Sequence, residues 1–251
     1  MCLILFSFQP GSDYPLTVIA NRDEFYARPS RRGHFWEDLP SVFGGRDLQA
    51  GGSWMAVERS GRFAAVTNYR EDAQAPENLI SRGALISDFF AQSETPHDYL
   101  RDIEARGHRF AGFNLLVGDA TEFWCYSNRE SGLTRVEPGV HGLSNGSLNE
   151  SWPKVDTGKA SLAEAIECNA SLEQLQAILL DETRGERDKL PDTGVGWEAE
   201  ELLSSRFIRS DNYGTCTTTV MQIARNGVID WREQYFDKDG ASEKASQWHI
   251  A

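Results

Sequence analysis

A cysteine directly follows the first methionine of the chain, at the start of the apolar segment MCLILFSF. Methionine aminopeptidases remove Met1 when the second residue is small, and this would make Cys2 the N-terminal residue. Its thiol would then be a nucleophile beside a free α-amine, which titrates at about pH 8 and can act as the base. The alternative is that Cys2 is a small apolar residue that begins a buried strand. Taken alone, the Met-Cys pair favours the packing role.

The polar tetrapeptide NRDE follows the apolar segment LTVIA without a break. If residues 2–8 and 16–20 pair as an antiparallel hairpin, Asp23 returns to the neighbourhood of Cys2. There its carboxylate could hold the α-ammonium group, while the Arg22 guanidinium lowers the pKa of the thiol. The other interpretation is a turn with surface salt bridges, which contribute little to stability.

Asn68, in VTNYR, and Asn145, in GLSNG, each stand where a predicted strand meets a loop. An Asn amide can donate to an oxyanion, although both residues could equally cap a turn. His141 precedes Asn145 closely and is the one histidine retained as a site candidate. The candidates for binding a substrate are Asn21, Glu24, Asn68 and His141.

The sequence predicts neither a metal nor a cofactor. The five histidines and four cysteines lack the spacing of metal ligands, and the separations between the cysteines are too long for zinc or redox motifs. Nucleotide-binding loops of the GxGxxG or GxxxxGK[ST] type are missing, as is the G-x-S-x-G elbow of serine hydrolases.

The elements that must position these residues are antiparallel strand pairs with helices collected between them, which indicates an α+β layered domain. Strands or hairpins are predicted at 2–8, 16–20, 51–70, 110–119, 121–128, 132–146, 214–225 and 227–237. Helices are predicted at 81–91, 96–106, 155–168 and 171–181, and a surface loop at 183–197. With neither a repeat nor a long linker, we expect a single domain over residues 1–251.

Charge and composition narrow the class of protein. The net charge of −13 argues against nucleic acid as a partner, because a basic stripe is needed to neutralise phosphates. The apolar LILFSF opening is too short for a membrane span, so we expect no integral membrane segment. Four widely spaced cysteines favour a reducing, cytoplasmic setting. A small molecule is the expected partner, and the oligomeric state is not determined by the sequence.

Eight ordered blocks resemble the NRDE family, also called the transport and Golgi organization protein 2 family. They are MCLI, ANRDEFYARP, GGSWMAV, GRFAAVTNYR, SRGALISDFF, GFNLLVGD, HGLSNGSLNESWPKV and YGTCTTTV. The resemblance covers residues 1 to about 237. That family is similar to the N-terminal nucleophile hydrolases of the penicillin V acylase and bile salt hydrolase type. The resemblance implies a four-layer αββα sandwich with the processed N-terminal residue at the end of a central strand.

The resemblance also implies roles for single residues. Cys2 would be the nucleophile, Asp23 would bind the α-amine with Arg22 or Asn21 beside it, and Asn145 would supply the oxyanion hole. The stretch SSRFIR resembles an acylase segment that contains a functional arginine, which points to Arg206. Family members usually read Y-G-T-R where this chain reads YGTC, so Cys216 replaces an expected arginine.

The leading hypothesis is therefore a cytoplasmic hydrolase that attacks a non-peptide C–N amide bond through Cys2. The alternative is a non-catalytic protein on the same scaffold that binds or transports haem or lipid (acyl-CoA), with Cys2 or His141 touching haem iron. A scaffold whose active site has decayed is the third possibility. The substrate is not determined by the sequence.

Overall fold

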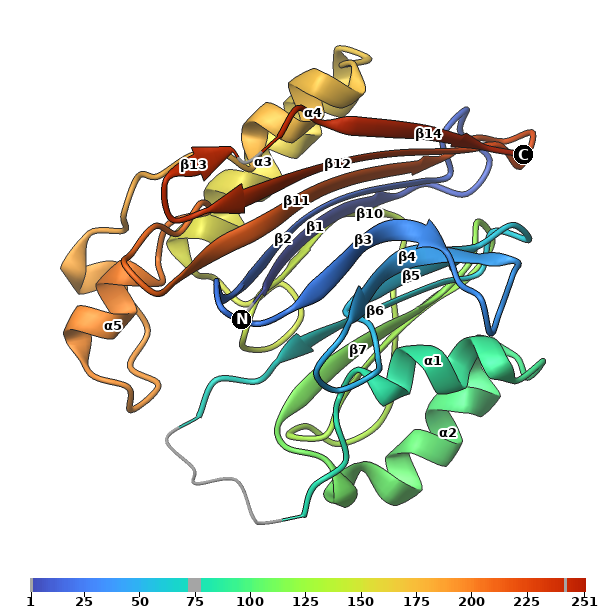
Figure 1. Ribbon diagram of the computed structural model, residues 1–251, viewed down its shortest axis with the longest axis horizontal. Coiled ribbons are helices and arrows are strands. Elements are labelled where there is room, and N and C mark those ends of the chain that lie inside the picture. Colours follow the sequence, from blue (N-terminus) through green and yellow to red (C-terminus); the bar gives the residue numbers. More distant parts are fainter. Residues whose placement is uncertain (1, 72–77, 242) are drawn as a thin grey trace.

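The computed structural model of the chain describes residues 2–71, 78–241 and 243–251. In this part of the chain, two seven-stranded antiparallel sheets lie face to face, and helices cover both outer faces (Figure 1). The order of the layers is helix, sheet, sheet, helix. The αββα sandwich expected from the sequence is confirmed.

The first sheet begins with Cys2, and its strands lie in the order β10, β1, β2, β11, β12 and β13, with β14 also paired to β12. β1 and β2 form the hairpin predicted for residues 2–8 and 16–20, in a register that sets Cys2 opposite Arg22. On the other side of β2, Thr217 of β11 lies opposite Arg22. The strands are β1 (Cys2–Phe8), β2 (Leu16–Phe25), β10 (Gly139–Leu143), β11 (Tyr213–Ile223), β12 (Ile229–Asp237), β13 (Gly240–Ala241) and β14 (Ser246–Ile250).

The second sheet is a meander in which β3 to β9 pair in chain order. Its strands are β3 (Ser30–Phe35), β4 (Val42–Asp47), β5 (Met55–Glu58), β6 (Phe63–Asn68), β7 (Phe113–Gly118), β8 (Phe123–Ser127) and β9 (Thr134–Arg135). The hairpin predicted over 51–70 is the β5–β6 pair, and the pair predicted over 110–128 is β7–β8.

Sequence reasoning misses β3 and β4, and the reasons are local. β3 reads SRRGHF, and its polar side chains are tolerated because it is an edge strand. In β4, Gly44 and Gly45 interrupt the apolar alternation that indicates a strand. Packing requires Gly45, because a Cβ atom there would lie 2.2 Å from the ring of Trp54. β14 is missed as well, since most of its residues are polar.

Alternation along the strands divides the core into layers. In β1, Ile4 and Phe6 pack between the two sheets, whereas Leu3 and Leu5 pack on the opposite face against α3 and α4. α1 and α2 cover the second sheet in the same way. The helices are α1 (Ala84–Ala91), α2 (Pro96–Arg106), α3 (Pro153–Glu167), α4 (Leu172–Ile178), α5 (Trp197–Leu202) and the short 3₁₀ turns η1 (Gly107–Arg109) and η2 (Arg187–Lys189).

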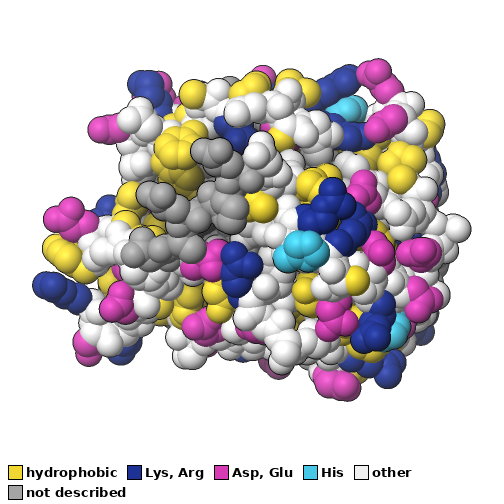
Figure 2. Space-filling view, turned by 90° about the horizontal axis from the view of Figure 1, so that it is seen from below, with side chains coloured by type: hydrophobic (Ala, Val, Ile, Leu, Met, Phe, Trp, Pro, Cys, Tyr) yellow, Lys and Arg dark blue, Asp and Glu magenta, His cyan; other side chains and the backbone are white. Residues whose placement is uncertain are grey.

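Two expectations from the sequence concern the surface and the helices: that nucleic acid is not a partner, and that the chain has no integral membrane segment. Basic and acidic side chains are interspersed on the face shown in Figure 2, where no continuous basic stripe is visible. Over the ranges that the structure describes, every helix is too short or too polar to cross a membrane.

Candidate active site

Cys2 lies at the start of β1 and lines a cavity of about 350 Å³, hereafter the Cys2 cavity. The end of β2 supplies one wall of this cavity, and β6 and the start of the α1 segment supply others. The lining residues that bear on chemistry are Cys2, Arg22, Asp23, Glu24, Arg28, Asp47, Trp54, Asn68 and Arg82. The register of the β1–β2 hairpin thus brings Cys2 together with Arg22, Asp23 and Glu24, as the sequence predicts for Cys2 and Asp23.

Burial and a nearby guanidinium act on the Cys2 thiol in opposite directions. Burial raises the pKa of the thiol, and the positive charge of Arg22 opposes that rise. The strand end itself is held in place, because the Ser144 hydroxyl donates to the Cys2 carbonyl oxygen at 3.2 Å. The site therefore presents a well-positioned thiol whose ionisation requires help from a neighbouring base.

Arginines and carboxylates share the mouth of the Cys2 cavity. Arg28 donates through Nε and Nη2 to Asp47, at 3.0 and 2.7 Å, and lies 3.7 Å from Glu24. Arg22 lies 3.9 Å from the same Glu24 carboxylate, and its guanidinium sits 4.4 Å from the centre of the Trp54 ring. Such a mixture of fixed charges suits a polar or charged ligand better than a purely apolar one.

Asp23 is fully buried beside Cys2. Its Oδ1 accepts a hydrogen bond from the Thr215 hydroxyl at 2.7 Å, and its carbonyl oxygen accepts one from the Tyr213 hydroxyl at 3.1 Å. Burial raises the pKa of the Asp23 carboxyl, and the positive charge of Lys154 opposes the rise. A carboxylate in this position can attract an ammonium group at the start of β1.

Sequence reasoning misses Lys154, a buried cation that contributes to this site. Lys154 lies in the first turn of α3, is 3% exposed, and donates through Nζ to the carbonyl oxygen of Leu203 at 2.8 Å. Burial lowers its pKa to about 8, while the negative charge of Asp23 acts in the other direction. A signal exists, because a lysine stands between apolar residues in the block SWPKV.

Arg70 is a second buried cation that sequence reasoning misses. It forms an ion pair with Glu200 of α5, and each side chain is 3% exposed. Its guanidinium lies 4.9 Å from the centre of the Trp152 ring. Its backbone N–H donates to the carbonyl oxygen of Asn145 at 2.6 Å. Arg70 comes two residues after the end of β6, and a charge this close to an apolar segment, as in NRDE, could have indicated it.

The two candidate oxyanion donors lie at different depths. Asn68 lines the Cys2 cavity, at the end of β6. Asn145 is 0% exposed and lies behind it, where its Nδ2 donates to the carbonyl oxygen of Asn68 at 2.8 Å. Of the two, Asn68 is therefore the residue that lines the cavity with Cys2, and Asn145 holds the backbone of Asn68 in place.

Asn21 and Arg206 lie together, apart from the lining of the Cys2 cavity. Asn21 donates through Nδ2 to the carbonyl oxygens of Leu179 and Arg206, at 2.9 and 2.7 Å. The Arg206 guanidinium forms an ion pair with Asp181 and reaches the hydroxyl of Ser161 at 3.3 Å. These contacts anchor the segment around Arg206 to the first sheet and direct its charge towards Asp181.

His141 lies further along the first sheet. It pairs with Phe6 in β10, and the two rings stack with their centroids 5.2 Å apart. Phe6 is four residues from Cys2 along an extended strand, a separation of about 13 Å. Both ring nitrogens have partners, because Nε2 lies 2.8 Å from the Glu137 carbonyl oxygen and Nδ1 lies 2.9 Å from the Asn149 amide. His141 is therefore not positioned as a ligand in the Cys2 cavity.

Cys216 occupies the β-bulge of β11, where the register against β2 shifts. Its thiol lies 3.4 Å from the carbonyl oxygen of Glu24, and burial raises its pKa to about 11. It lines a separate cavity of about 290 Å³, the second cavity, which shares Arg22 and Arg28 with the Cys2 cavity. At this position the chain thus has a neutral thiol instead of a fixed cation.

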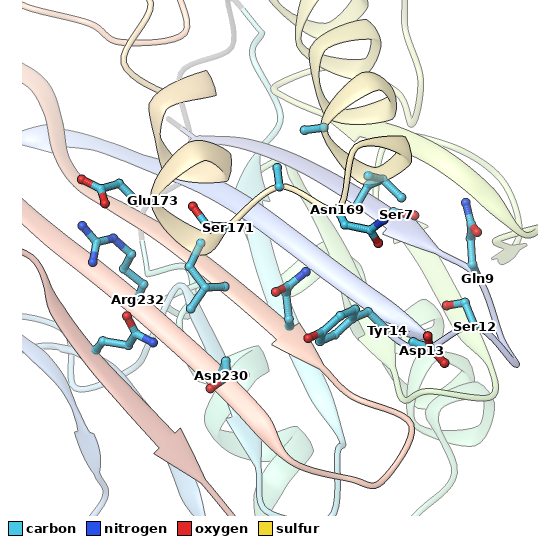
Figure 3. A pocket seen from close by; sticks show the side chains of 16 residues that line it. Ser7, Gln9, Ser12, Asp13, Tyr14, Asn169, Ser171, Glu173, Asp230 and Arg232 are labelled. Atoms are coloured by element: carbon cyan, nitrogen blue, oxygen red, sulfur yellow. The ribbon is translucent and has the colours of Figure 1, made fainter.

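A larger cavity, of about 850 Å³, lies elsewhere along the first sheet (Figure 3). It is formed where the β1–β2 hairpin and the outer face of β12 meet the connection between α3 and α4, with Ser7, Tyr14 and Arg232 among its lining residues. None of the site residues predicted from the sequence lines it. Its size does not make it the better candidate, because no cysteine is among the described residues that line it. Within the described ranges, no three His, Cys, Asp or Glu side chains gather as metal ligands.

Fold and site together define an αββα sandwich with a cysteine at the first position of a central strand. Residues 1–238 match the family Transport and Golgi organisation 2, and the chain belongs to this family. The Transport and Golgi organization 2 homolog of Mus musculus is 33% identical over 262 residues, covering 95% of each chain. The Homo sapiens homolog is 34% identical with the same coverage. The Drosophila melanogaster protein is 28% identical, covering 93% of this chain and 92% of its own. The resemblance read from the sequence is confirmed.

Two solved structures have a related arrangement. The mutant C2A conjugated bile acid hydrolase from Clostridium perfringens aligns with a TM-score of 0.48 and 10% identity, over 100% of this chain and 92% of its own. The Caenorhabditis elegans ortholog of N-acylethanolamine-hydrolyzing acid amidase aligns with a TM-score of 0.44 and 12% identity, over 88% of this chain and 92% of its own. At these values, neither similarity carries an argument about the reaction of this chain.

Proposed function

We propose that this protein is a cysteine-dependent hydrolase of a non-peptide C–N amide bond, acting in the cytoplasm. The observation that carries the proposal is the position of Cys2, whose thiol lines a cavity together with Arg22, Asp23 and Asn68. The proposal requires that Met1 be removed, because only then does Cys2 carry the α-amine that serves as base. A small amide-containing molecule is the proposed substrate, and neither a metal nor a cofactor is needed.

In the proposed reaction, the α-amine of Cys2 accepts the thiol proton as Sγ attacks the amide carbonyl carbon. The Asn68 amide donates to the oxyanion that forms, and Asn145 keeps the backbone of Asn68 in place. The C–N bond then breaks, and the leaving amine takes the proton from the α-ammonium group. Water attacks the resulting thioester with the α-amine again as base, releasing a carboxylic acid and restoring the thiol.

Charged residues around Cys2 support this chemistry in the proposal. Asp23 stabilises the α-ammonium form, and Lys154 favours the ionised state of Asp23. Arg22 favours the Cys2 thiolate, because it opposes the effect of burial on the thiol pKa. We assign the further cation of the site to Arg82, which lines the Cys2 cavity, rather than to Arg206, which pairs with Asp181.

The test is amine release from a panel of N-acyl amides, combined with the intact mass of the protein. Both are measured in a Cys168→Ser background, so that the exposed free thiol of Cys168 does not contribute to either measurement. We expect loss of Met1 and turnover that falls at least about a thousandfold on Cys2→Ser, whereas Cys168→Ser alone retains it. A fully active protein that keeps Met1, or one that tolerates Cys2→Ser, would disprove the proposal.

Ligand binding without turnover is the second candidate function, and the raised pKa of the buried Cys2 thiol favours it. Haem and acyl lipids are the ligands to test. A Soret shift on haem titration that is lost in Cys2→Ala but kept in His141→Ala would support binding in the Cys2 cavity. The absence of any shift, together with turnover of an amide, would leave the hydrolase as the function.

A further inference from the structure

The second cavity is lined by an unusual concentration of positive charge. Arg22, Arg28 and Arg32 all contribute to its walls, together with the hydroxyl-bearing Tyr26 and Ser30. No Asp or Glu is among the residues of the described ranges that line it. Three guanidinium groups around a space of about 290 Å³ form an environment that favours an anion.

The carboxylates that partner these arginines approach from outside the cavity lining. Arg28 donates through Nε and Nη2 to a single oxygen of Asp47. Arg32 pairs with Glu243, and both side chains are substantially exposed, at 41% and 58%. An exposed ion pair of this kind contributes little to stability, so a ligand anion can compete for Arg32 at small cost.

Arg22 provides an independent indication of a ligand. Its side chain is 6% exposed, yet its nearest carboxylate oxygen in the described chain, Oε2 of Glu24, is 3.9 Å away and beyond hydrogen-bond distance. The flat guanidinium rests on Trp54 instead, 4.4 Å from the ring centre. A buried guanidinium normally satisfies its donors with carboxylate or carbonyl oxygens, and here it faces the cavities that it lines.

Neutral hydrogen-bond donors also line the second cavity. Burial raises the pKa of Tyr26, so its hydroxyl stays protonated and can donate to an anion. Ser30 adds a second hydroxyl. The fork of an arginine matches the paired oxygens of a carboxylate or a phosphate, and several forks around one space bind such a group more tightly than a single one.

We propose that the second cavity binds an anionic oxygen group, a carboxylate or a phosphate of a small molecule, through Arg22, Arg28 and Arg32. Because Arg22 and Arg28 also line the Cys2 cavity, one ligand can place its anionic end here and its remaining part beside Cys2. The anion site goes beyond the proposed hydrolase function and exists whether or not Cys2 is a nucleophile.

The test is calorimetric titration of the full chain with inorganic phosphate and, separately, with acetate, at an ionic strength held constant with NaCl. We expect saturable binding of at least one of the two probes, and the tighter probe identifies the class of anion. Arg32→Gln should weaken that binding at least about fivefold, because it removes one fork from a site that keeps its buried walls.

The matched control is Arg31→Gln, the same charge change on the preceding residue of β3. Arg31 pairs with Glu37 and does not line the second cavity. The affinity of this variant should stay within about twofold of the parent, because the Arg31 guanidinium does not face the anion. Cys2→Ser should bind the anion with the affinity of the parent. Anion binding can therefore be measured in a variant that lacks the proposed nucleophile, which distinguishes loss of the anion site from loss of catalysis. No saturable binding, or equal weakening by Arg31→Gln and Arg32→Gln, would overturn the proposal.

Discussion

Glu233 is a buried carboxyl that joins the two sheets and does not line the Cys2 cavity. Its Oε2 accepts from the backbone N–H of Gly33 at 2.8 Å and from the Tyr235 hydroxyl at 3.0 Å, and Thr219 donates to its other oxygen at 3.4 Å. Burial raises its pKa to about 7 even though these donors and the charge of Arg32 act in the other direction. The folded protein therefore holds this proton more tightly than the unfolded chain does.

This raised pKa predicts a specific dependence of stability on pH. In the unfolded chain the Glu233 carboxyl has its ordinary pKa of 4.5, so it loses its proton there first as the pH rises. The proton on Glu233 stabilises the folded protein by at most about 3 kcal/mol. This contribution is fully present below pH 4.5 and is lost as the pH rises to about 7. Glu233→Gln removes this titration. Between about pH 5 and pH 8, the free energy of unfolding of the variant should therefore rise relative to that of the parent. Urea titrations at both pH values measure the difference, and parallel pH profiles would contradict the assignment.

At the scale of single elements, β4 positions Trp54 and thereby the guanidinium of Arg22. Gly45 leaves room for the indole, since a Cβ atom there would lie 2.2 and 2.3 Å from two ring carbons. Gly45→Ala should therefore destabilise the protein by about 1–3 kcal/mol, because the ring must move. The measurement is the free energy of unfolding in urea.

A second variant separates the clash from any general effect of alanine in β4. In a Trp54→Phe background the two clashing ring carbons are absent, so Gly45→Ala should cost clearly less there than in the parent. A double-mutant cycle gives this difference directly. An equal cost in both backgrounds would show that backbone propensity, rather than the indole, decides the effect.

At the scale of the whole molecule, the sequence suffices to predict the αββα layers and the meeting of Cys2 with Asp23. The alternating strands and the hairpin of β1 and β2 are local features, and the resemblance of the ordered blocks to a family implies the four layers. Contacts between distant segments are not local, which is why the contribution of Lys154 from α3 is missed. The resemblance of SSRFIR to an acylase segment predicts Arg206 at the site, and it does not show that the guanidinium pairs with Asp181. No spacing rule predicts which of several buried charges will face one another across layers.

The buried ion pair of Arg70 and Glu200 is such a contact across the molecule. Arg70 follows β6 of the second sheet, whereas Glu200 lies in α5 and also accepts from the backbone N–H of Thr193 at 2.9 Å. Arg70→Met leaves a buried carboxylate uncompensated and should cost about 3–5 kcal/mol of unfolding free energy. The double variant with Glu200→Met should recover part of that loss, since two apolar side chains can pack where two charges met. If the double variant loses at least as much unfolding free energy as the two single variants together, the pair is not the link that we infer between the second sheet and α5.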